Sequence, residues 1–237
     1  MARLRALIVS AFEPEIAPLR RLIDGTAGVR LEPVGIGAVD AAAGAARAIA
    51  AHRPERVLFV GTAGVYPSAR SGLAIGGAVL PGEIHCVSTA ALAGDGYLPG
   101  PQVVQAAASQ KLAAALAGDA AELATAVVAC PLAITRSAAL ARRIAAATGA
   151  SLENLELFAV ARAAAGAGAE FAAVLGVANR VGSAAHREWL ANHRRASRAA
   201  CAVIARWIRQ HSDIRTTRNS RTARRFSRKR YGSDTLS

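Results

Sequence analysis

The chain has 237 residues, of which 53% are hydrophobic and 19% charged, and its mean hydropathy is +0.27. This length and composition suit one folded domain with a buried centre and exclude a disordered chain. No uncharged stretch approaches the roughly 20 apolar residues needed to cross a bilayer. The N-terminal apolar run is bounded by Glu13 and Glu15 and indicates a strand rather than a signal peptide, so we expect a cytoplasmic protein without a membrane span.

The net charge of +13 is unevenly distributed along the chain. Residues 212–237 hold eight basic and two acidic side chains, which gives +6 of the +13. This segment is rich in Ser, Thr and Arg and has almost no aliphatic residues, so we predict a disordered basic tail after a folded domain at residues 1–211. Nucleic acid is not an expected partner of the domain itself. An RNA-binding or membrane-surface arm is the alternative function of the tail.

The cysteines and histidines do not form a metal-binding pattern. Cys86, Cys130 and Cys201 are widely separated and lack paired spacing, so we interpret them as small core residues. His186 and His193 lie seven residues apart, and no third ligand accompanies them. We therefore expect neither a metal nor a cofactor.

The first part of the chain alternates between apolar runs of strand length and segments with helical periodicity. Gly61 to Gly64 then predicts a tight turn directly after a buried strand. The predicted elements are, in order, strand Leu4 to Ser10, helix Glu13 to Ile23, strand Val29 to Val34, helix Ala38 to His52 and strand Arg56 to Val60.

The middle of the chain, Ser71 to Pro101, mixes Gly, Pro and short apolar runs and predicts short strands and loops. Alternating strands and helices with short links predict an α/β fold, with three α/β/α layers and a central mixed β-sheet. The remaining predicted elements are helix Ala106 to Leu116, strand Ala124 to Thr135, helices Ser137 to Ala147 and Leu155 to Ala167, strand Phe171 to Val177, and helix Ser183 to His211.

Polar residues or glycines directly follow several predicted strands. In α/β sheets ligands bind at the carboxyl ends of the strands, so these segments are the candidate site. Two carboxylates, Glu153 and Glu156, also open an otherwise apolar predicted helix. The segments after strands are Ala11 to Glu15, Gly35 to Gly37, Gly61 to Gly64 and Ala178 to Arg180.

The order of these segments resembles the nucleoside phosphorylase superfamily, specifically its nucleosidase branch, over roughly Leu4 to Arg195. Gly35 to Gly64 is similar to the family's glycine turn, helix and GSAG-type loop. The resemblance implies that Thr62, which replaces the usual Ser, lines the substrate pocket together with Ala63 and Gly64.

Two acidic motifs extend the resemblance. The opening AFEPEI is similar to the family's acidic segment, in which Glu15 corresponds to the carboxylate that activates water. ENLE resembles the ribose-binding motif, which implies that Glu156 binds the sugar diol and that Leu155 takes the usual Met position. Phe12 is the first candidate to stack on the base, ahead of Phe158 and Phe171; the alternative is that each of them is a core residue.

The last motif distinguishes between branches of the family. In adenine-specific nucleosidases the corresponding strand ends in Ser-Asp and the Asp protonates the base, whereas here it ends in Ala178-Asn179. An amide cannot act as a general acid, but it can bond the N7 or O6 edge of a 6-oxopurine. The run from Asn179 to Gly182, with His186 and Trp189 nearby, is most similar to futalosine hydrolase, whose substrate carries hypoxanthine.

The resemblance implies a homo-oligomeric nucleosidase that hydrolyses a 6-oxopurine nucleoside. The expected substrate is futalosine, cleaved to hypoxanthine and the dehypoxanthine product, a menaquinone precursor. Glu15 and Asn179 are the expected catalytic residues. The alternatives are a phosphate-dependent purine nucleoside phosphorylase, for which no phosphate-binding segment can be identified, and a catalytically idle nucleoside-binding relative.

Overall fold

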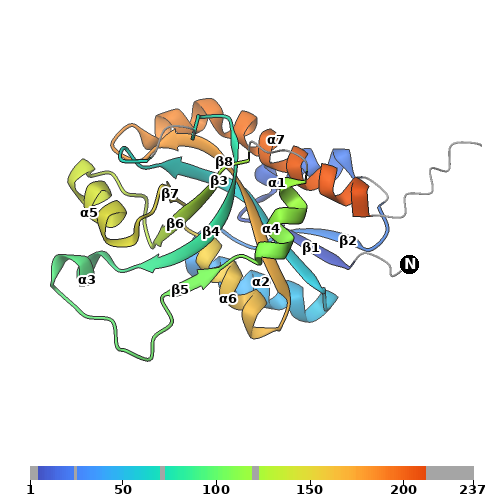
Figure 1. Cartoon of the computed structure of the whole chain (residues 1–237), viewed down its shortest axis with the longest axis horizontal. Helices are drawn as coiled ribbons and strands as arrows, with labels where there is room; N and C mark the ends of the chain where they lie inside the picture. Colours follow the sequence, from blue (N-terminus) through green and yellow to red (C-terminus); the bar gives the residue numbers. More distant parts are fainter. Residues whose placement is uncertain (1–4, 24–25, 70–72, 119–122, 212–237) are drawn as a thin grey trace, which may run out of the picture.

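The computed structural model describes residues 5–23, 26–69, 73–118 and 123–211, so the predicted basic tail lies outside the described residues. A mixed eight-stranded sheet lies between helices on its two faces (Figure 1). This arrangement confirms the predicted α/β fold class. None of the described helices is long and apolar enough to cross a membrane.

The strands and helices follow one another along the chain with short links between most of them. In order, they are β1 (Ala6–Ser10), α1 (Glu13–Leu22), β2 (Val29–Pro33), α2 (Ala38–His52), β3 (Arg56–Val65), β4 (Ala78–Val87), α3 (Thr89–Ala93), β5 (Gln105–Ala107), α4 (Gln110–Ala117), β6 (Thr125–Pro131), α5 (Ala138–Thr148), β7 (Leu152–Glu153), α6 (Leu157–Gly166), β8 (Glu170–Arg180) and α7 (Ala185–His211).

The sheet combines a parallel half with a closed ring of strands. β2, β1, β3 and β8 pair in parallel, with β3 and β8 paired from Arg56 and Glu170 to Val65 and Arg180. β8 also pairs antiparallel with β4, and β4, β6 and β7 continue back to β3. Five strands, β3, β8, β4, β6 and β7, therefore close on themselves. The carboxyl ends of β1, β3 and β8 lie together at one edge.

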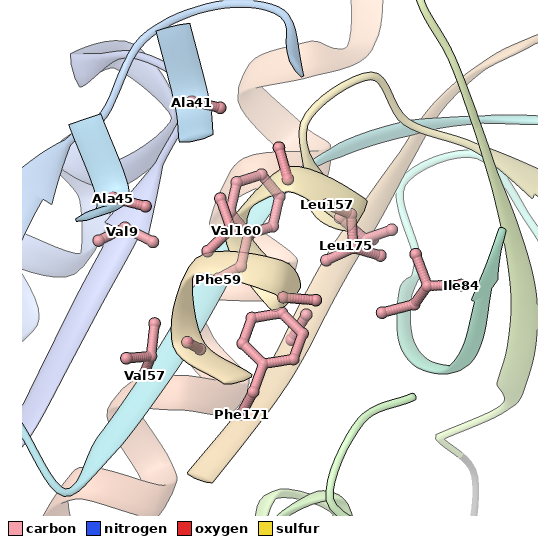
Figure 2. Close-up of a cluster of buried hydrophobic side chains, with 14 of the residues drawn as sticks. Val9, Ala41, Ala45, Val57, Phe59, Ile84, Leu157, Val160, Phe171 and Leu175 are labelled. Atoms are coloured by element: carbon pink, nitrogen blue, oxygen red, sulfur yellow. The ribbon is translucent and has the colours of Figure 1, made fainter. Parts of the chain in front are cut away.

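Alternate residues of the central strands bury their side chains on opposite faces, as the two-residue period of a strand requires. Val57 and Phe59 of β3 belong to the core cluster beneath α2 and α6, which Figure 2 shows together with Val9, Ala45 and Val160. The intervening Leu58 and Val60 belong to a second cluster beneath α1, α4 and α7. Two cores, one on each face, hold the strands that carry the site.

Two sequence-based predictions were wrong because residues expected in a turn or a helix belong to strands. Gly61–Gly64 does not form a tight turn, because β3 continues through it to Val65 and pairs with β8 over that stretch. The predicted helix from Ala106 begins only at Gln110, because Gln105–Ala107 pairs with β4 as β5. In both places pairing with a distant strand overrides the local preference.

The contact between α7 and β8 depends on Gly176. A Cβ at this position would lie 2.2 Å from the backbone oxygen of Ala196, whereas Gly166 at the end of α6 has open space around it. We expect Gly176→Ala to lower the free energy of unfolding by about 3 kcal/mol, because the helix backbone must move away. Urea denaturation checks this. Gly166→Ala is the matched control and should leave stability unchanged or slightly raised, and equal effects of the two changes would contradict the packing argument.

Candidate functional site

A cavity of about 310 Å³ opens at the carboxyl ends of β1, β3 and β8. All eight side chains or backbone positions predicted from the sequence line it. They are Phe12, Glu15, Thr62, Ala63, Gly64, Leu155, Glu156 and Asn179. The remaining lining residues are Ala11, Ile36, Ile134, Glu153, Asn154, Ala185, His186 and Trp189.

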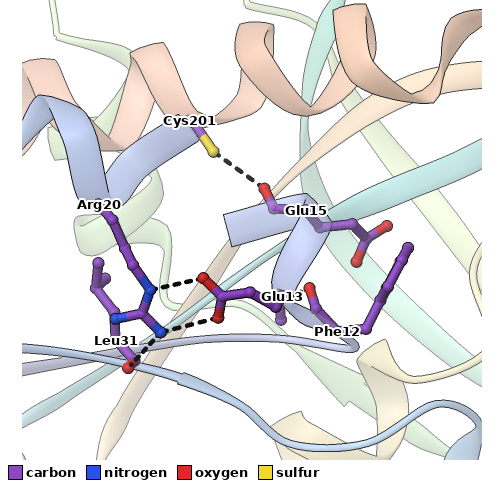
Figure 3. Close-up of polar contacts among 7 residues, drawn as sticks. Phe12, Glu13, Glu15, Arg20, Leu31 and Cys201 are labelled. Carbon is purple, nitrogen blue, oxygen red and sulfur yellow. Dashed lines mark hydrogen bonds and ion pairs between the residues drawn. The ribbon is translucent and has the colours of Figure 1, made fainter. Parts of the chain in front are cut away.

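Glu15 is placed in the cavity by the first turn of α1. Pro14 suits this turn because its missing N–H would have no helical partner there, and acidic residues are favoured at a helix N-terminus. The Cys201 thiol of α7 donates to the Glu15 backbone oxygen at 3.3 Å (Figure 3), which ties the turn to the opposite helix. Glu13, two residues earlier, points elsewhere and pairs with Arg20 at 2.7 Å.

The Glu15 carboxylate is only 4% exposed and is held by one oxygen. Its Oε1 accepts from the Thr62 backbone N–H at 2.9 Å and from the Thr62 hydroxyl at 2.7 Å, while the buried Oε2 has no protein partner. Burial raises the pKa of Glu15 to about 8, with a further increase from the charge of Glu156, although the Thr62 hydrogen bonds oppose the rise. Glu15 therefore has an unbonded oxygen and a proton affinity suited to proton transfer near neutral pH.

Glu156 lies at the start of α6 and accepts a hydrogen bond from the Gly37 N–H at 2.8 Å. Gly37 has φ +82, a conformation that side chains disfavour, and it is the N-cap residue of α2. Asn154 fixes the neighbouring backbone, since its Oδ1 accepts from the Glu156 N–H and its Nδ2 donates to the Thr62 oxygen. Burial raises the pKa of Glu156, and the Gly37 hydrogen bond opposes this.

Glu153 differs from its predicted place at the start of a helix. It lies in β7, where Oε2 accepts from the Tyr66 hydroxyl at 2.7 Å and Oε1 from the Thr135 N–H at 3.0 Å. Both oxygens are therefore engaged: Oε2 bonds Tyr66 directly after β3, and Oε1 bonds Thr135 in the segment after β6. Asn154 was missed as a site residue, although it lies inside the ENLE motif between the two carboxylates.

Asn179 lies on β8 directly over Gly64 of β3, where a Cβ would come within 2.8 Å of Asn179 Nδ2. One hydrogen of Nδ2 bonds the Arg180 backbone oxygen at 2.9 Å. The second hydrogen and Oδ1 have no partner among the described residues, so the amide retains one donor and one acceptor for a ligand.

The wall formed by α7 is aromatic. Trp189 stacks on His193 with ring centroids 4.3 Å apart, lies 6.1 Å from Phe12, and is flanked by His186 at 6.2 Å. Sequence reasoning placed His186 and Trp189 near the site but assigned them no role, and it missed Ile36 and Ile134. The helical spacing of 186, 189 and 193 was the available signal for one shared face.

The described lining contains three glutamates and neither lysine nor arginine. A ligand that enters this cavity therefore meets acidic side chains without a compensating cation, and Glu15 is mostly ionised above its pKa of about 8. Neutral hydroxyl groups and developing positive charge are favoured there, and an anion such as phosphate is disfavoured. Among the described residues there is also no group of three or more His, Cys, Asp or Glu side chains that could hold a metal ion.

A family model described as the phosphorylase superfamily matches residues 9–209. The chain therefore belongs to the phosphorylase superfamily, which confirms the resemblance identified from the motifs. None of the curated proteins is similar enough in sequence to match the chain.

Solved structures with the same fold include nucleosidases and a hydrolase. A Helicobacter pylori MTAN mutant with 5′-methylthioadenosine in its active site shares 17% identity, with 89% of this chain and 100% of that chain covered and a TM-score of 0.78. The Neisseria meningitidis 5′-methylthioadenosine/S-adenosylhomocysteine nucleosidase with methylthio-immucillin-A shares 19% identity, with 87% of this chain and 99% of that chain covered and a TM-score of 0.76. Helicobacter pylori futalosine hydrolase shares 17% identity, with 87% of this chain and 98% of that chain covered and a TM-score of 0.77. At these identities the likeness establishes the shared fold.

The buried carboxylate of Glu15 predicts a pH-dependent stability. Because its folded pKa of about 8 lies above the unfolded value of 4.5, the folded state binds the proton more tightly, and stability falls as pH rises between these values. Glu15→Gln removes this charge, so we expect its unfolding free energy to exceed that of the unmodified chain by up to about 4 kcal/mol at pH 9, with the advantage shrinking towards pH 5. Urea denaturation at the two pH values measures the difference.

Glu13→Gln is the matched control for this experiment, because Glu13 lies on the same turn but outside the cavity. The hydrogen bond from Arg20 lowers the pKa of Glu13, so its contribution to stability is present at high pH and lost in acid. We expect Glu13→Gln to lower stability at pH 9 by at most about 1 kcal/mol, as for other exposed ion pairs. A stabilisation at pH 9 shared by both variants would contradict a specific effect of burying Glu15.

Proposed function

We propose that the protein is a nucleosidase that hydrolyses the N-glycosidic bond of a 6-oxopurine nucleoside. The observation that carries this proposal is the convergence of Glu15, Glu156 and Asn179 on one cavity whose described lining holds no lysine or arginine. These three side chains come from α1, the start of α6 and β8. Each suits a different part of a nucleoside: the anomeric carbon, the sugar diol and the base.

Glu15 has the geometry of a general base for water. Glu15 lines the cavity; its Oε1 accepts from two Thr62 donors, and its buried Oε2 has no protein partner. In the proposed step, Oε2 takes a proton from water as the water oxygen forms a bond to the anomeric carbon. The bond from that carbon to the base nitrogen breaks, and its electron pair leaves with the base. Positive charge that develops on the ribosyl centre is stabilised by the nearby carboxylates.

Glu156 is the proposed ribose ligand. A carboxylate accepts from two vicinal hydroxyls in charge-assisted hydrogen bonds, and Glu156 is already oriented by the Gly37 N–H. Leu155 supplies an apolar contact beside it. Fixing the sugar in this way aligns the anomeric carbon with the water on Glu15, which lowers the entropic cost of the attack.

Asn179 is the proposed base ligand. Its free amide hydrogen can donate to O6 or N7 of hypoxanthine, and its Oδ1 can accept from N7 when that nitrogen carries a proton. The bond from the amide hydrogen strengthens as negative charge develops on the base, which is where catalysis gains from it. Futalosine is the specific substrate that we propose, because Asn179 favours a 6-oxopurine and a futalosine hydrolase shares the fold.

The cavity suits water better than phosphate as the nucleophile that attacks the anomeric carbon. A phosphorylase needs cationic or N–H donors around the attacking anion. Here the anion would face Glu15 and Glu156 with no lysine or arginine in the described lining. The charge distribution therefore supports hydrolysis over phosphorolysis.

A homo-oligomer is part of the proposal. Figure 1 shows a long loop between α3 and β5 that extends away from the sheet. The exposed fractions of its side chains show that it carries exposed apolar groups. Tyr97 is 86% exposed, Leu98 39% and Val103 48%. Apolar groups gathered on one loop favour contact with another protein surface, and a second copy of the chain is the partner we propose. A monomeric mass by light scattering would contradict it.

The test of the proposed function is base release from futalosine, inosine and methylthioadenosine, each with and without phosphate, followed by chromatography. We expect hypoxanthine from futalosine at the same rate with or without phosphate. Cleavage of inosine that requires phosphate would show a phosphorylase instead. Release of adenine from methylthioadenosine in preference to hypoxanthine would contradict the role given to Asn179, and no release from any of the three would contradict the proposal as a whole.

The role of Glu15 predicts a distinct pH profile. Only the carboxylate form can take the proton from water, so turnover should rise with pH and level off above about 8, the pKa to which burial raises this group. Glu15→Gln should lower kcat by about 10² to 10⁴ while the chain stays folded. Steady-state kinetics between pH 5 and 9.5 measure both effects. A flat profile, or a Glu15→Gln enzyme with unchanged kcat, would rule out Glu15 as the base.

A further inference from the structure

Trp189 of α7 makes a polar contact that its aromatic surroundings do not require. Its Nε1–H donates to Thr62 Oγ1 at 3.0 Å, across the junction between α7 and β3. An indole N–H is only a donor, so the direction of this bond is certain. Thr62 Oγ1 must be the acceptor.

This direction constrains the proton of the Thr62 hydroxyl. The hydroxyl carries one proton, and its oxygen lies 2.7 Å from Glu15 Oε1. Because the hydroxyl oxygen already accepts from Trp189, the O–H group of Thr62 donates its hydrogen bond to Glu15 Oε1. The Thr62 backbone N–H donates to the same oxygen at 2.9 Å, so both protein donors lie on Oε1 and neither lies on Oε2.

We propose that Trp189 is a positioning residue for the hydrolysis proposed above: its indole N–H fixes the Thr62 hydroxyl as a donor to Glu15 Oε1 and leaves Oε2 as the oxygen that takes the proton from water. The inference rests on the proposed function for its catalytic consequence. The hydrogen-bond chain itself, from Trp189 through Thr62 to Glu15, is a feature of the fold.

The packing around the indole restricts its rotation. His193 stacks on it at 4.3 Å with an interplanar angle of 15°, while Phe12 and His186 flank it at 6.1 and 6.2 Å. The N–H is therefore held towards Thr62 before any ligand enters. Pre-orientation of this kind removes the cost of ordering the hydroxyl during the reaction.

Other titratable groups lie close to the hydrogen-bond chain from Trp189 to Glu15. Any pH experiment must distinguish their titrations from that of Glu15. Glu156 from the start of α6 and Glu153 from β7 line the same cavity as Glu15. The Cys201 thiol of α7 contacts the Glu15 backbone. His186 and His193 lie on either side of Trp189.

Trp189→Phe tests the proposal, because it keeps an aromatic ring and removes the donor. A hydroxyl that no longer accepts from the indole can rotate away, so the Glu15 carboxylate loses stabilisation. We expect the acidic limb of the kcat profile to move upward by roughly half a pH unit in Trp189→Phe and by about one pH unit in Thr62→Val. In the Thr62→Val background, Trp189→Phe should cause no further movement, because the hydroxyl that links the two residues is absent.

Trp207→Phe is the matched control, because Trp207 lies on the same helix and its Nε1 has no partner in the described structure. Trp207→Phe should leave the acidic limb of the kcat–pH profile at the same pH as in the unmodified protein. The chain has two tryptophans, so in Trp207→Phe protein the residue at 189 can also be replaced biosynthetically by benzothienylalanine, which puts sulfur in place of the N–H. This replacement keeps the bicyclic shape and should move the limb as Trp189→Phe does.

A readout independent of turnover separates this inference from the proposed function. The carboxyl signal that disappears in Glu15→Gln identifies Glu15 in ¹³C NMR of glutamate-labelled protein, and its titration can be followed without substrate. A rise of the Glu15 pKa in Trp189→Phe supports the hydrogen-bond chain from Trp189 through Thr62 to Glu15, even if none of the tested nucleosides is cleaved. An unchanged titration in both the Phe and benzothienylalanine proteins, or an equal movement with and without the Thr62 hydroxyl, would overturn the proposal.

Discussion

The site depends on how the protein accommodates a carboxylate without a counter-ion in its interior. Glu15 is nearly fully buried, the charge of Glu156 raises its pKa further, and the backbone N–H and hydroxyl of Thr62 stabilise its carboxylate. Burying such a group is costly unless donors are fixed in place before it ionises. Those donors belong to β3, which pairs with β1 as far as Phe59 and with β8 at Thr62, so a strand of the central sheet holds them in place.

Thr62 is also the point at which the other parts of the site connect. Its backbone oxygen accepts from Asn154, which in turn holds the start of α6 and thereby Glu156. Its hydroxyl connects α1 with α7 through Glu15 and Trp189. Elements far apart in the sequence are therefore joined by hydrogen bonds to one residue, Thr62. A displacement of β3 by a fraction of an ångström would therefore disturb the positions of Glu15 and Glu156 together.

The site was more predictable from the sequence than the geometry that surrounds it. Glu15, Glu156 and Asn179 lie in short motifs after strands, so local pattern and family resemblance were enough to predict that they line one cavity. The continuation of β3 through Gly61–Gly64 was not predictable from local preference, because it depends on pairing with β8 more than a hundred residues later. Asn154 and Trp189 were missed as structural supports for the same reason: their partner, Thr62, is distant in sequence.

The closed ring of strands has a consequence for association of the folded protein. Each strand in the ring has a partner strand on both sides, so the described sheet offers open edges chiefly at β2 and β5. β5 has three residues, and β2 has five and ends in Pro33, which cannot donate to a neighbouring strand. Short edges interrupted by proline are poor templates for strand addition. The connectivity that shapes the cavity thereby also protects the chain from edge-to-edge aggregation.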